Sequence, residues 1–304
     1  MNAHTAHPSE AAPTLELRQF ALRSAGAAWT TPLSLRSDAQ RIGLVGDWEP
    51  LFQLLTGSAE DASGSAKILG YELEHALSRG VLGFAACDPP LPTSFTVSEY
   101  LRHAARLTHG SASRARHDAT RALDRYGLSE LGERKISQLA TYQRRALGIA
   151  LSTLNSPPVV YLEGPLRDLD APSADYIARL CIEAGARGRV ILSAALPVTP
   201  SPERSLLDTC DELFLRKQGA LVAQGAPSSV FTAGARYLLT VKGPNIPDFS
   251  RALREAGLAL EERARVGSFK VELPAGASGT TDTLLDAALA HGLIVLELEP
   301  LFTV

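Results

Sequence analysis

The sequence contains little cysteine. Cys87, Cys181 and Cys210 are the only cysteines among 304 residues. They are odd in number, lie far apart and show no metal-ligand spacing, so a disulfide framework and a cysteine metal site are both disfavoured. We expect three small buried side chains in a reducing compartment.

The sequence also lacks a long apolar run and an excess of positive charge. No apolar stretch approaches the roughly 20 residues that span a bilayer. Residues 1–13 lack the apolar core of a signal peptide and are expected to form a disordered tail. The net charge of −3 gives no overall field favouring nucleic acid or an anionic membrane. With 45% hydrophobic and 21% charged residues, we expect one large or two smaller globular domains.

Residues 43–57 lack the centre of a phosphate-binding loop, although both ends of such a loop are present. A buried strand at 41–45 leads into Gly46, and an apolar helix at 51–55 leads out to Gly57. The pattern G-x-x-x-x-G-K-[ST] needs glycines that bring N–H groups to phosphate, a Lys for the β- and γ-phosphates, and a hydroxyl for Mg²⁺. None of these central features is present.

Acidic residues replace that centre. We expect Asp47 to cap the following helix and Pro50 to lie in its first turn. Asp47 and Glu49 then lie at the helix end that would otherwise attract phosphate. Whether they are ordinary capping acids or groups that repel polyphosphate, weak or no phosphate binding is predicted.

The rest of the chain alternates between apolar strands and amphipathic helices, which predicts a parallel α/β sheet. Thr96 and Glu99 have the spacing of a capping box at the start of a helix. Strands are expected at residues 15–20, 33–35, 41–45, 81–87, 159–162, 190–193 and, as the last strand of this sheet, 213–215. After about residue 236 the order becomes βαββαβ, which is typical of a small two-layer α+β unit of ferredoxin type.

Several fragments together identify a family. Their order and spacing resemble the ATP-binding subunit of ABC transporters along nearly the whole chain. They include Gly43-Leu44-Val45-Gly46 with Leu54-Leu55-Thr56-Gly57, Asp88-Pro89, Ser137-Gln138-Leu139 with Gln143-Arg144-Arg145, Pro157-Pro158-Val159-Val160-Tyr161-Leu162, Leu169-Asp170 and Gly219 to Pro227. The resemblance is greatest to exporter-type subunits that carry a C-terminal accessory domain.

The resemblance implies a fold and its division into domains. We expect an ABC-type P-loop NTPase-like α/β domain at residues 14–236, with a helical subdomain at about 95–145. A C-terminal α+β domain of ferredoxin type is expected at 237–304.

The departures from the family fall on its reactive positions. The loop is about four residues shorter than the family's. Cys87 stands where the family has glutamine, Ala140 where its signature L-S-G-G-Q has serine, and Ala195 near its switch histidine. Glu163 and Gly164 stand for the family's Asp-Glu pair, so the general base is lost. The aromatic that stacks on adenine is missing from residues 24–27, and Trp29 is the nearest candidate.

We therefore expect vestigial nucleotide-site positions and no catalytic, cofactor-binding or metal-ligating residue. The vestigial positions are Gly43, Gly46, Asp47, Glu49, Cys87, Ala140, Glu163, Gly164 and Ala195. The lost roles are independent, and each typically costs two or more powers of ten in rate. The chain is thus predicted neither to hydrolyse ATP nor to bind ATP-Mg appreciably.

Some positions remain as candidates for an interface. These are Asp170, Gln143, Arg144 and Asp88. In the family, Asp170 would lie at the dimer interface, although capping of the helix that follows it is an equal alternative. Arg144 and Arg145 are interpreted either as solvated helix charges or as contacts to a partner subunit.

The sequence favours a non-catalytic subunit of a bacterial membrane transporter complex. Its expected partners are a membrane-embedded subunit and either an active ABC ATPase subunit or a second copy, with no nucleic acid. Its expected location is cytoplasmic, peripheral on the inner face of the cell membrane. The alternatives are a soluble scaffold or regulatory protein that reuses the fold, and a weakly ATP-binding transporter subunit.

Overall fold

A computed structural model describes residues 12–22, 31–55, 62–109, 111–197, 201–217, 219–232, 236–273 and 281–301. Two sequence-based expectations fall outside these ranges. They are most of the N-terminal tail and the adenine-contact region at residues 24–27 with Trp29.

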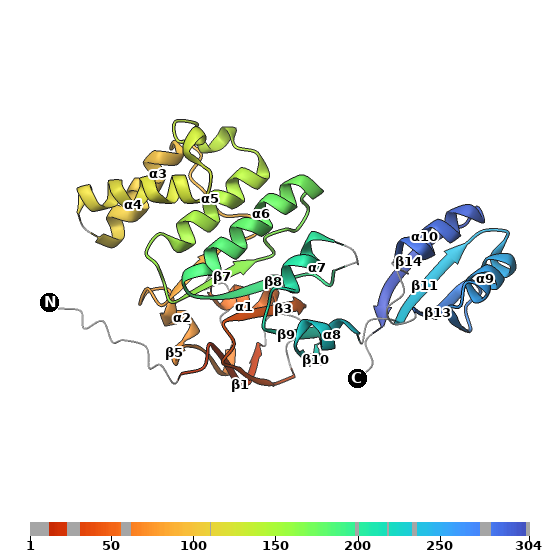
Figure 1. Ribbon diagram of the computed structural model, residues 1–304. Helices are drawn as coiled ribbons and strands as arrows, with labels where there is room; N and C mark the ends of the chain where they lie inside the picture. Colours follow the sequence, from red (N-terminus) through yellow and green to blue (C-terminus); the bar gives the residue numbers. More distant parts are fainter. Residues whose placement is uncertain are drawn as a thin grey trace.

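A six-stranded sheet in the order β10-β9-β3-β8-β7-β6 forms the centre of the N-terminal lobe (Figure 1). Its strands are β3 (Arg41–Gly46), β6 (Leu82–Ala85), β7 (Val159–Glu163), β8 (Arg189–Ala194), β9 (Glu212–Lys217) and β10 (Ala220–Gly225). All neighbours are parallel except β10 and β9. Every residue of β7 is buried because the sheet is covered on both faces. The predicted parallel α/β sheet is confirmed.

The expectation that β9 would be the last strand of this sheet is wrong. β10 follows it in a hairpin, with Ala220 opposite Lys217 and Gly219 at a φ of +85° in the turn. β10 is an edge strand with no fully buried residue. Its residues 220–223 nevertheless form an apolar run, so a strand signal was present in the sequence.

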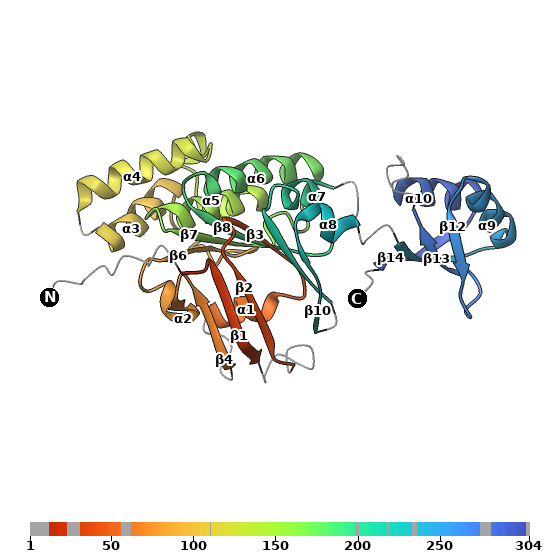
Figure 2. The same ribbon diagram turned by 60° about the horizontal axis from the view of Figure 1, so that its bottom comes forward.

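The two faces of the central sheet carry different layers (Figure 2). One face packs against α5 (Thr141–Thr153), α6 (Ala171–Ala184), α7 (Pro202–Leu207) and α8 (Pro227–Thr232). The other faces a second sheet in the order β2-β1-β4-β5. Its strands are β1 (Leu15–Leu22), β2 (Leu33–Ser37), β4 (Ala62–Ile68) and β5 (Tyr71–Glu72), joined by the helices α1 (Glu49–Leu55) and α2 (Leu73–Ala76).

The helical part of the lobe consists of α3 (Val97–His109) and α4 (Ala112–Arg125), followed by short turns at Ser129–Leu131 and Ile136–Gln138. The predicted capping box is confirmed. The Thr96 N–H donates to Glu99 Oε2 at 2.8 Å, and the Glu99 N–H donates to Thr96 Oγ1 at 3.2 Å. Ser111 caps α4 through a single hydrogen bond, in which its Oγ accepts the Arg114 N–H.

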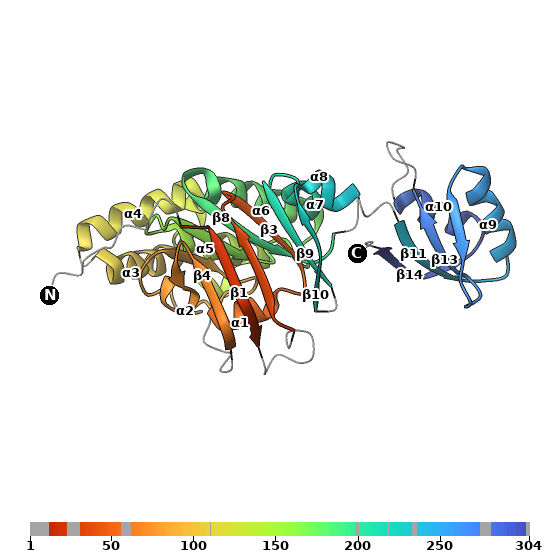
Figure 3. The same cartoon turned by 90° about the horizontal axis from the view of Figure 1, so that it is seen from below.

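The C-terminal unit lies to one side of the N-terminal lobe in all three views (Figures 1, 2 and 3). Its elements are β11 (Arg236–Lys242), α9 (Ile246–Glu255), β12 (Ala259–Glu262), β13 (Ser268–Glu272), α10 (Thr281–Ala290) and β14 (Ile294–Leu301). The antiparallel sheet has the order β12-β13-β11-β14 and its own core. This is the predicted ferredoxin-type arrangement. An ion pair of 2.5 Å between Lys217 and Glu299 links it to β9.

Within the described ranges, no helix is both long and apolar enough to cross a membrane.

Candidate functional site

The candidate site lies at the carboxyl ends of the parallel strands, where open α/β sheets place their ligands. Gly43 lies inside β3, and Gly46 ends that strand with a φ of +93°. A side chain on Gly46 would place its Cβ 2.0 Å from the carbonyl oxygen of Arg216 on β9. Gly46 is therefore a glycine because two strands approach closely there, whether or not any phosphate binds.

The loop after Gly46 is folded against β9. The Asp47 N–H donates to the Arg216 carbonyl at 3.3 Å, and the Arg216 guanidinium donates back to the Asp47 carbonyl at 2.9 Å. Helix α1 consequently begins at Glu49, and the residue before it is Trp48. Asp47 lies two residues before α1, and pairing with β9 holds its backbone, so its role as the cap of this helix stays a prediction.

The backbone N–H groups of this loop are largely engaged within the protein. Besides that of Asp47, the Trp48 N–H donates to the Gly46 carbonyl at 2.9 Å, and the Leu51 N–H donates to the Trp48 carbonyl at 3.1 Å. Pro50 has no N–H to offer. The groups that cradle phosphate in a complete loop are thus bonded to carbonyl oxygens of the chain itself.

Two large side chains fill the strand ends beside the loop. The Trp48 indole is 1% exposed and donates its N–H to the carbonyls of Val45, at 3.1 Å, and Phe214, at 3.2 Å. Arg216 is also 1% exposed and reaches the Gly219 carbonyl at 2.9 Å. Burial lowers the pKa of Arg216, and the nearby Asp47 carboxylate opposes that shift. Sequence reasoning missed both roles, although a tryptophan two residues after Gly46 was a signal for one of them.

A second network joins the ends of β6 and β7 to α5. Glu163 is 8% exposed, and its Oε2 accepts the Cys87 N–H at 2.9 Å. Arg145 Nε donates to the Cys87 carbonyl at 2.8 Å. Its Nη1 donates to the carbonyls of Pro165, at 3.3 Å, and Arg167. Burial raises the pKa of the Cys87 thiol, while the positive charges of Arg145 and Arg167 counteract that shift.

Arg145 therefore corrects the sequence analysis. It is neither a solvated charge nor a residue available to a partner, because it is 6% exposed and bonded to three backbone carbonyls. A buried guanidinium has to be satisfied in this way. Because Glu163 and Arg145 hold the N–H and the carbonyl of Cys87, they fix the loop that follows β6.

Gly164 occupies a turn that disfavours a side chain. Its φ is +47°, and a Cβ would lie 3.2 Å from Arg167 Nη2. Its N–H donates to the Ser193 carbonyl at 2.9 Å and to Ser193 Oγ at 3.2 Å. A glutamate at this position would strain the backbone and meet the Arg167 guanidinium.

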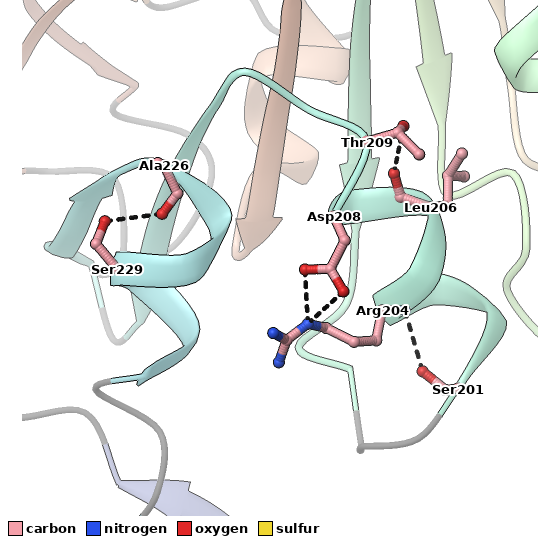
Figure 4. Close-up of polar contacts among 7 residues, drawn as sticks. All are labelled: Ser201, Arg204, Leu206, Asp208, Thr209, Ala226 and Ser229. Carbon is pink, nitrogen blue, oxygen red and sulfur yellow. Dashed lines mark hydrogen bonds and ion pairs between the residues drawn. The ribbon is translucent and has the colours of Figure 1, made fainter. Parts of the chain in front are cut away.

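Gly164 and Ala195 line a largely apolar cavity of about 290 Å³. Its walls are the loop of residues 164–168, the loop of residues 194–197, and α7. The titratable side chains in this lining are Arg167, Asp168 and Glu203. Ser201 Oγ accepts the Arg204 N–H at the start of α7 (Figure 4).

The predicted interface candidates make contacts within the chain. Gln143 Oε1 accepts the Ala140 N–H at 2.9 Å. Arg144 donates to the Leu139 carbonyl at 2.8 Å and to Thr141 Oγ1 at 3.3 Å. Both side chains thus stabilise the start of α5.

Two further candidates are exposed. Asp170 accepts the Ser173 N–H at 3.0 Å and caps α6, the alternative considered for it, and its pKa is lowered by hydrogen bonds from Ser173. Asp88 lies in the loop after β6.

Among the described side chains, no group of three or more His, Cys, Asp or Glu is placed to hold a metal ion.

Comparison with known proteins identifies the family. The chain is 30% identical over 195 residues to the lipoprotein-releasing system ATP-binding protein LolD of Pseudomonas fluorescens, covering 60% of this chain and 84% of LolD. The chain belongs to the ABC transporter ATP-binding proteins. It is also 25% identical over 173 residues to an uncharacterised member of this ABC family from Bacillus subtilis, YxlF.

Solved ABC structures share the fold. The chain matches cbiO1 of Clostridium perfringens, described as part of the ABC transporter complex cbiONQ, with a TM-score of 0.60 and 19% identity over 81% of this chain and 98% of that chain. An ATP-binding subunit of another ABC transporter matches with a TM-score of 0.59. No family model matches the chain. It spans 56% and 57% of the length of the first two curated ABC relatives, from Bacillus subtilis and a Nostoc species.

Proposed function

We propose that this ABC protein is a non-catalytic subunit of a membrane transporter complex and that it has lost both ATP binding and ATP hydrolysis. The observation that carries the proposal is the state of the loop after β3. The N–H groups of Asp47, Trp48 and Leu51 donate to carbonyls of the chain, and Pro50 has none. A polyphosphate would have to break these bonds without gaining the lysine that normally compensates.

The residues at the end of β7, where a metal ligand and a general base would be needed, also argue against Mg-ATP binding. Glu163 is the carboxylate that remains at the end of β7, and the Cys87 N–H already occupies one of its oxygens. The following position, Gly164, offers no base and is held at a positive φ. The residues present therefore do not fit a Mg-ATP group, and no step of hydrolysis can be assigned to them.

The proposed partner is a membrane-embedded transporter subunit. LolD is named as part of a lipoprotein-releasing system, and cbiO1 as part of an assembled ABC transporter complex. By this analogy the chain would dock, from the cytoplasmic side, on the inner face of the cell membrane. It would pair there with an active ABC ATPase subunit or with a second copy of itself.

A nucleotide titration tests the loss of ATP binding. Calorimetry with Mg-ATP is expected to give no saturable heat, corresponding to a Kd weaker than about 1 mM. Phosphate release is expected to equal the buffer blank. An ABC subunit with a complete G-x-x-x-x-G-K-[ST] loop serves as the positive control. A micromolar Kd would refute the proposed loss of binding, and steady turnover would refute the loss of catalysis.

Co-purification from the native host tests the transporter assignment. A tagged full-length chain, extracted in mild detergent, is expected to retain a polytopic membrane protein through size-exclusion chromatography. A known ABC subunit from the same host, tagged identically, controls for detergent effects. A stable homodimer or monomer with no membrane protein would favour the alternative of a soluble scaffold that reuses the fold.

A further inference from the structure

The surface formed by α3 and α4 carries a cluster of unpaired positive charge. These helices form the end of the N-terminal lobe that lies away from the C-terminal unit (Figures 1 and 3). Between them is a recess of about 310 Å³. Its basic lining consists of Arg102, His103 and Arg106 from α3 and Arg116 from α4, and all four are exposed.

The three arginines of this recess are available to a ligand. Arg114 and Arg125 on α4 are ion-paired with Asp118 and Glu183. Arg102, Arg106 and Arg116, by contrast, form no ion pair with any carboxylate of the described residues. Arg102 uses Nε for the Ser98 carbonyl at 3.2 Å, which leaves the two terminal nitrogens of its guanidinium.

One acid also lines the recess, and the three arginines outweigh its single negative charge. Glu99 Oε2 accepts the Thr96 N–H in the capping box. This bond lowers the pKa of Glu99, with further contributions from the Thr96 hydroxyl and from Arg102. The first turn of α4 contributes Ala112 to the lining, so the N-terminus of a 14-residue helix adds partial positive charge. The recess as a whole therefore attracts anions.

An exposed apolar side chain adjoins the arginines. Leu107 follows Arg106 on α3, lies one turn after His103, and is 78% exposed. The ring of Phe95 lines the recess and contacts His103, with ring centroids 5.9 Å apart. Arginines beside an exposed leucine are typical of surfaces that lie at the headgroup level of a bilayer, where the charges meet phosphate and the aliphatic group enters the acyl boundary.

We propose that α3 and α4 form a surface that binds an anionic phospholipid bilayer, with headgroup phosphates in the recess between Arg102, Arg106 and Arg116. The net charge of −3 is a sum over the whole chain and conceals this local cluster. The contact requires neither nucleotide nor a membrane subunit, so it stands apart from the proposed transporter role.

Vesicle co-sedimentation of the full chain tests this surface. The chain is expected to sediment with vesicles of equal parts phosphatidylglycerol and phosphatidylcholine, and not with phosphatidylcholine alone. The variant Arg102→Gln/Arg106→Gln/Arg116→Gln is expected to bind the anionic vesicles roughly 100-fold more weakly, since each basic residue near such a surface contributes about fivefold. Leu107→Ala is expected to weaken binding several-fold.

A matched variant controls for total charge. Arg79→Gln/Arg179→Gln/Arg265→Gln removes three exposed arginines from other parts of the molecule and gives the same net charge. It is expected to bind within about threefold of the wild type, because charges beyond a Debye length are screened. Circular dichroism confirms that both triple variants are folded.

Several outcomes would overturn the proposal. They include equal sedimentation with both kinds of vesicle or with neither, and equal losses in the two triple variants. Displacement by inorganic phosphate beyond that caused by sodium chloride of the same ionic strength would assign the recess to a soluble anion instead. Binding of an acidic peptide without vesicle binding would assign it to a protein partner. None of these results depends on whether a membrane subunit or ATP is bound.

Discussion

Replacing Trp48 with alanine is expected to lower the free energy of unfolding by about 3–5 kcal/mol. The indole is among the largest fully buried side chains and packs in the core between the two sheets. Its N–H also joins the ends of β3 and β9 through the carbonyls of Val45 and Phe214. Alanine would leave a cavity and two carbonyls without their donor, and a loss of this size is a large part of a typical domain's stability.

Two further variants separate the contribution of packing from that of the indole hydrogen bonds: one at Trp48 and one at a neighbouring aromatic residue. Trp48→Phe keeps most of the apolar volume and removes the N–H, so a loss of about 2 kcal/mol is expected. Phe52→Ala, on the helix that follows Trp48 and half-buried, is the matched aromatic control with an expected loss of about 1–2 kcal/mol. Urea unfolding followed by far-UV circular dichroism measures all three. A Trp48→Ala protein within about 1 kcal/mol of the wild type would show that the indole is not a core residue.

Replacing Arg145 with alanine is expected to destabilise the N-terminal lobe by about 3–5 kcal/mol. The guanidinium donates hydrogen bonds to the carbonyls of Cys87, Pro165 and Arg167. Among the described side chains, Arg145 is the donor recorded for these three oxygens. Its removal leaves buried acceptors unsatisfied at the ends of β6 and β7. Water can reach part of this site, because Cys87 is only half-buried, so the loss stays below the sum of three full penalties.

Hydrogen exchange followed by mass spectrometry locates the effect. Peptides that cover residues 86–91 and 163–168 are expected to lose protection first, whereas peptides of the C-terminal unit keep theirs because that unit has a separate core. Arg145→Lys keeps the charge but not the planar fork, so about half the loss is expected. Arg144→Ala, the neighbouring half-buried arginine, is expected to cost no more than about 1 kcal/mol. Equal effects at positions 144 and 145 would contradict the assigned role.

The sequence accounts for part of the candidate site, and the tertiary structure supplies contacts that residue order does not reveal. The missing lysine and hydroxyl are visible in the order of residues after Gly46. The contact that holds the loop after β3 was not visible, because Asp47 and Arg216 are 169 positions apart in the chain. The same holds for Arg145 and Cys87, which are 58 positions apart.

Local signals explain where sequence reasoning about the fold was accurate. The buried run of β7 and the capping box at Thr96 and Glu99 depend on residues a few positions apart, and both were predicted. β10 was missed although residues 220–223 form an apolar run, and its pairing with β9 became clear only in the structure. The role of Asp47 as a helix cap stays a prediction, because the contacts of its backbone with β9 do not test its side chain.

The sequence by itself determined the order of the central strands and helices, the ABC fold, and the absence of a lysine and a hydroxyl directly after Gly46. These follow from residue type and short-range spacing. Only the tertiary structure decided which contacts the residues around this loop make: Arg216 holds the loop after β3, Trp48 fills the strand ends, and Arg145 with Glu163 fixes Cys87. The physical reason is that a buried polar group must find a partner, and the fold, not the local sequence, determines which groups come within reach.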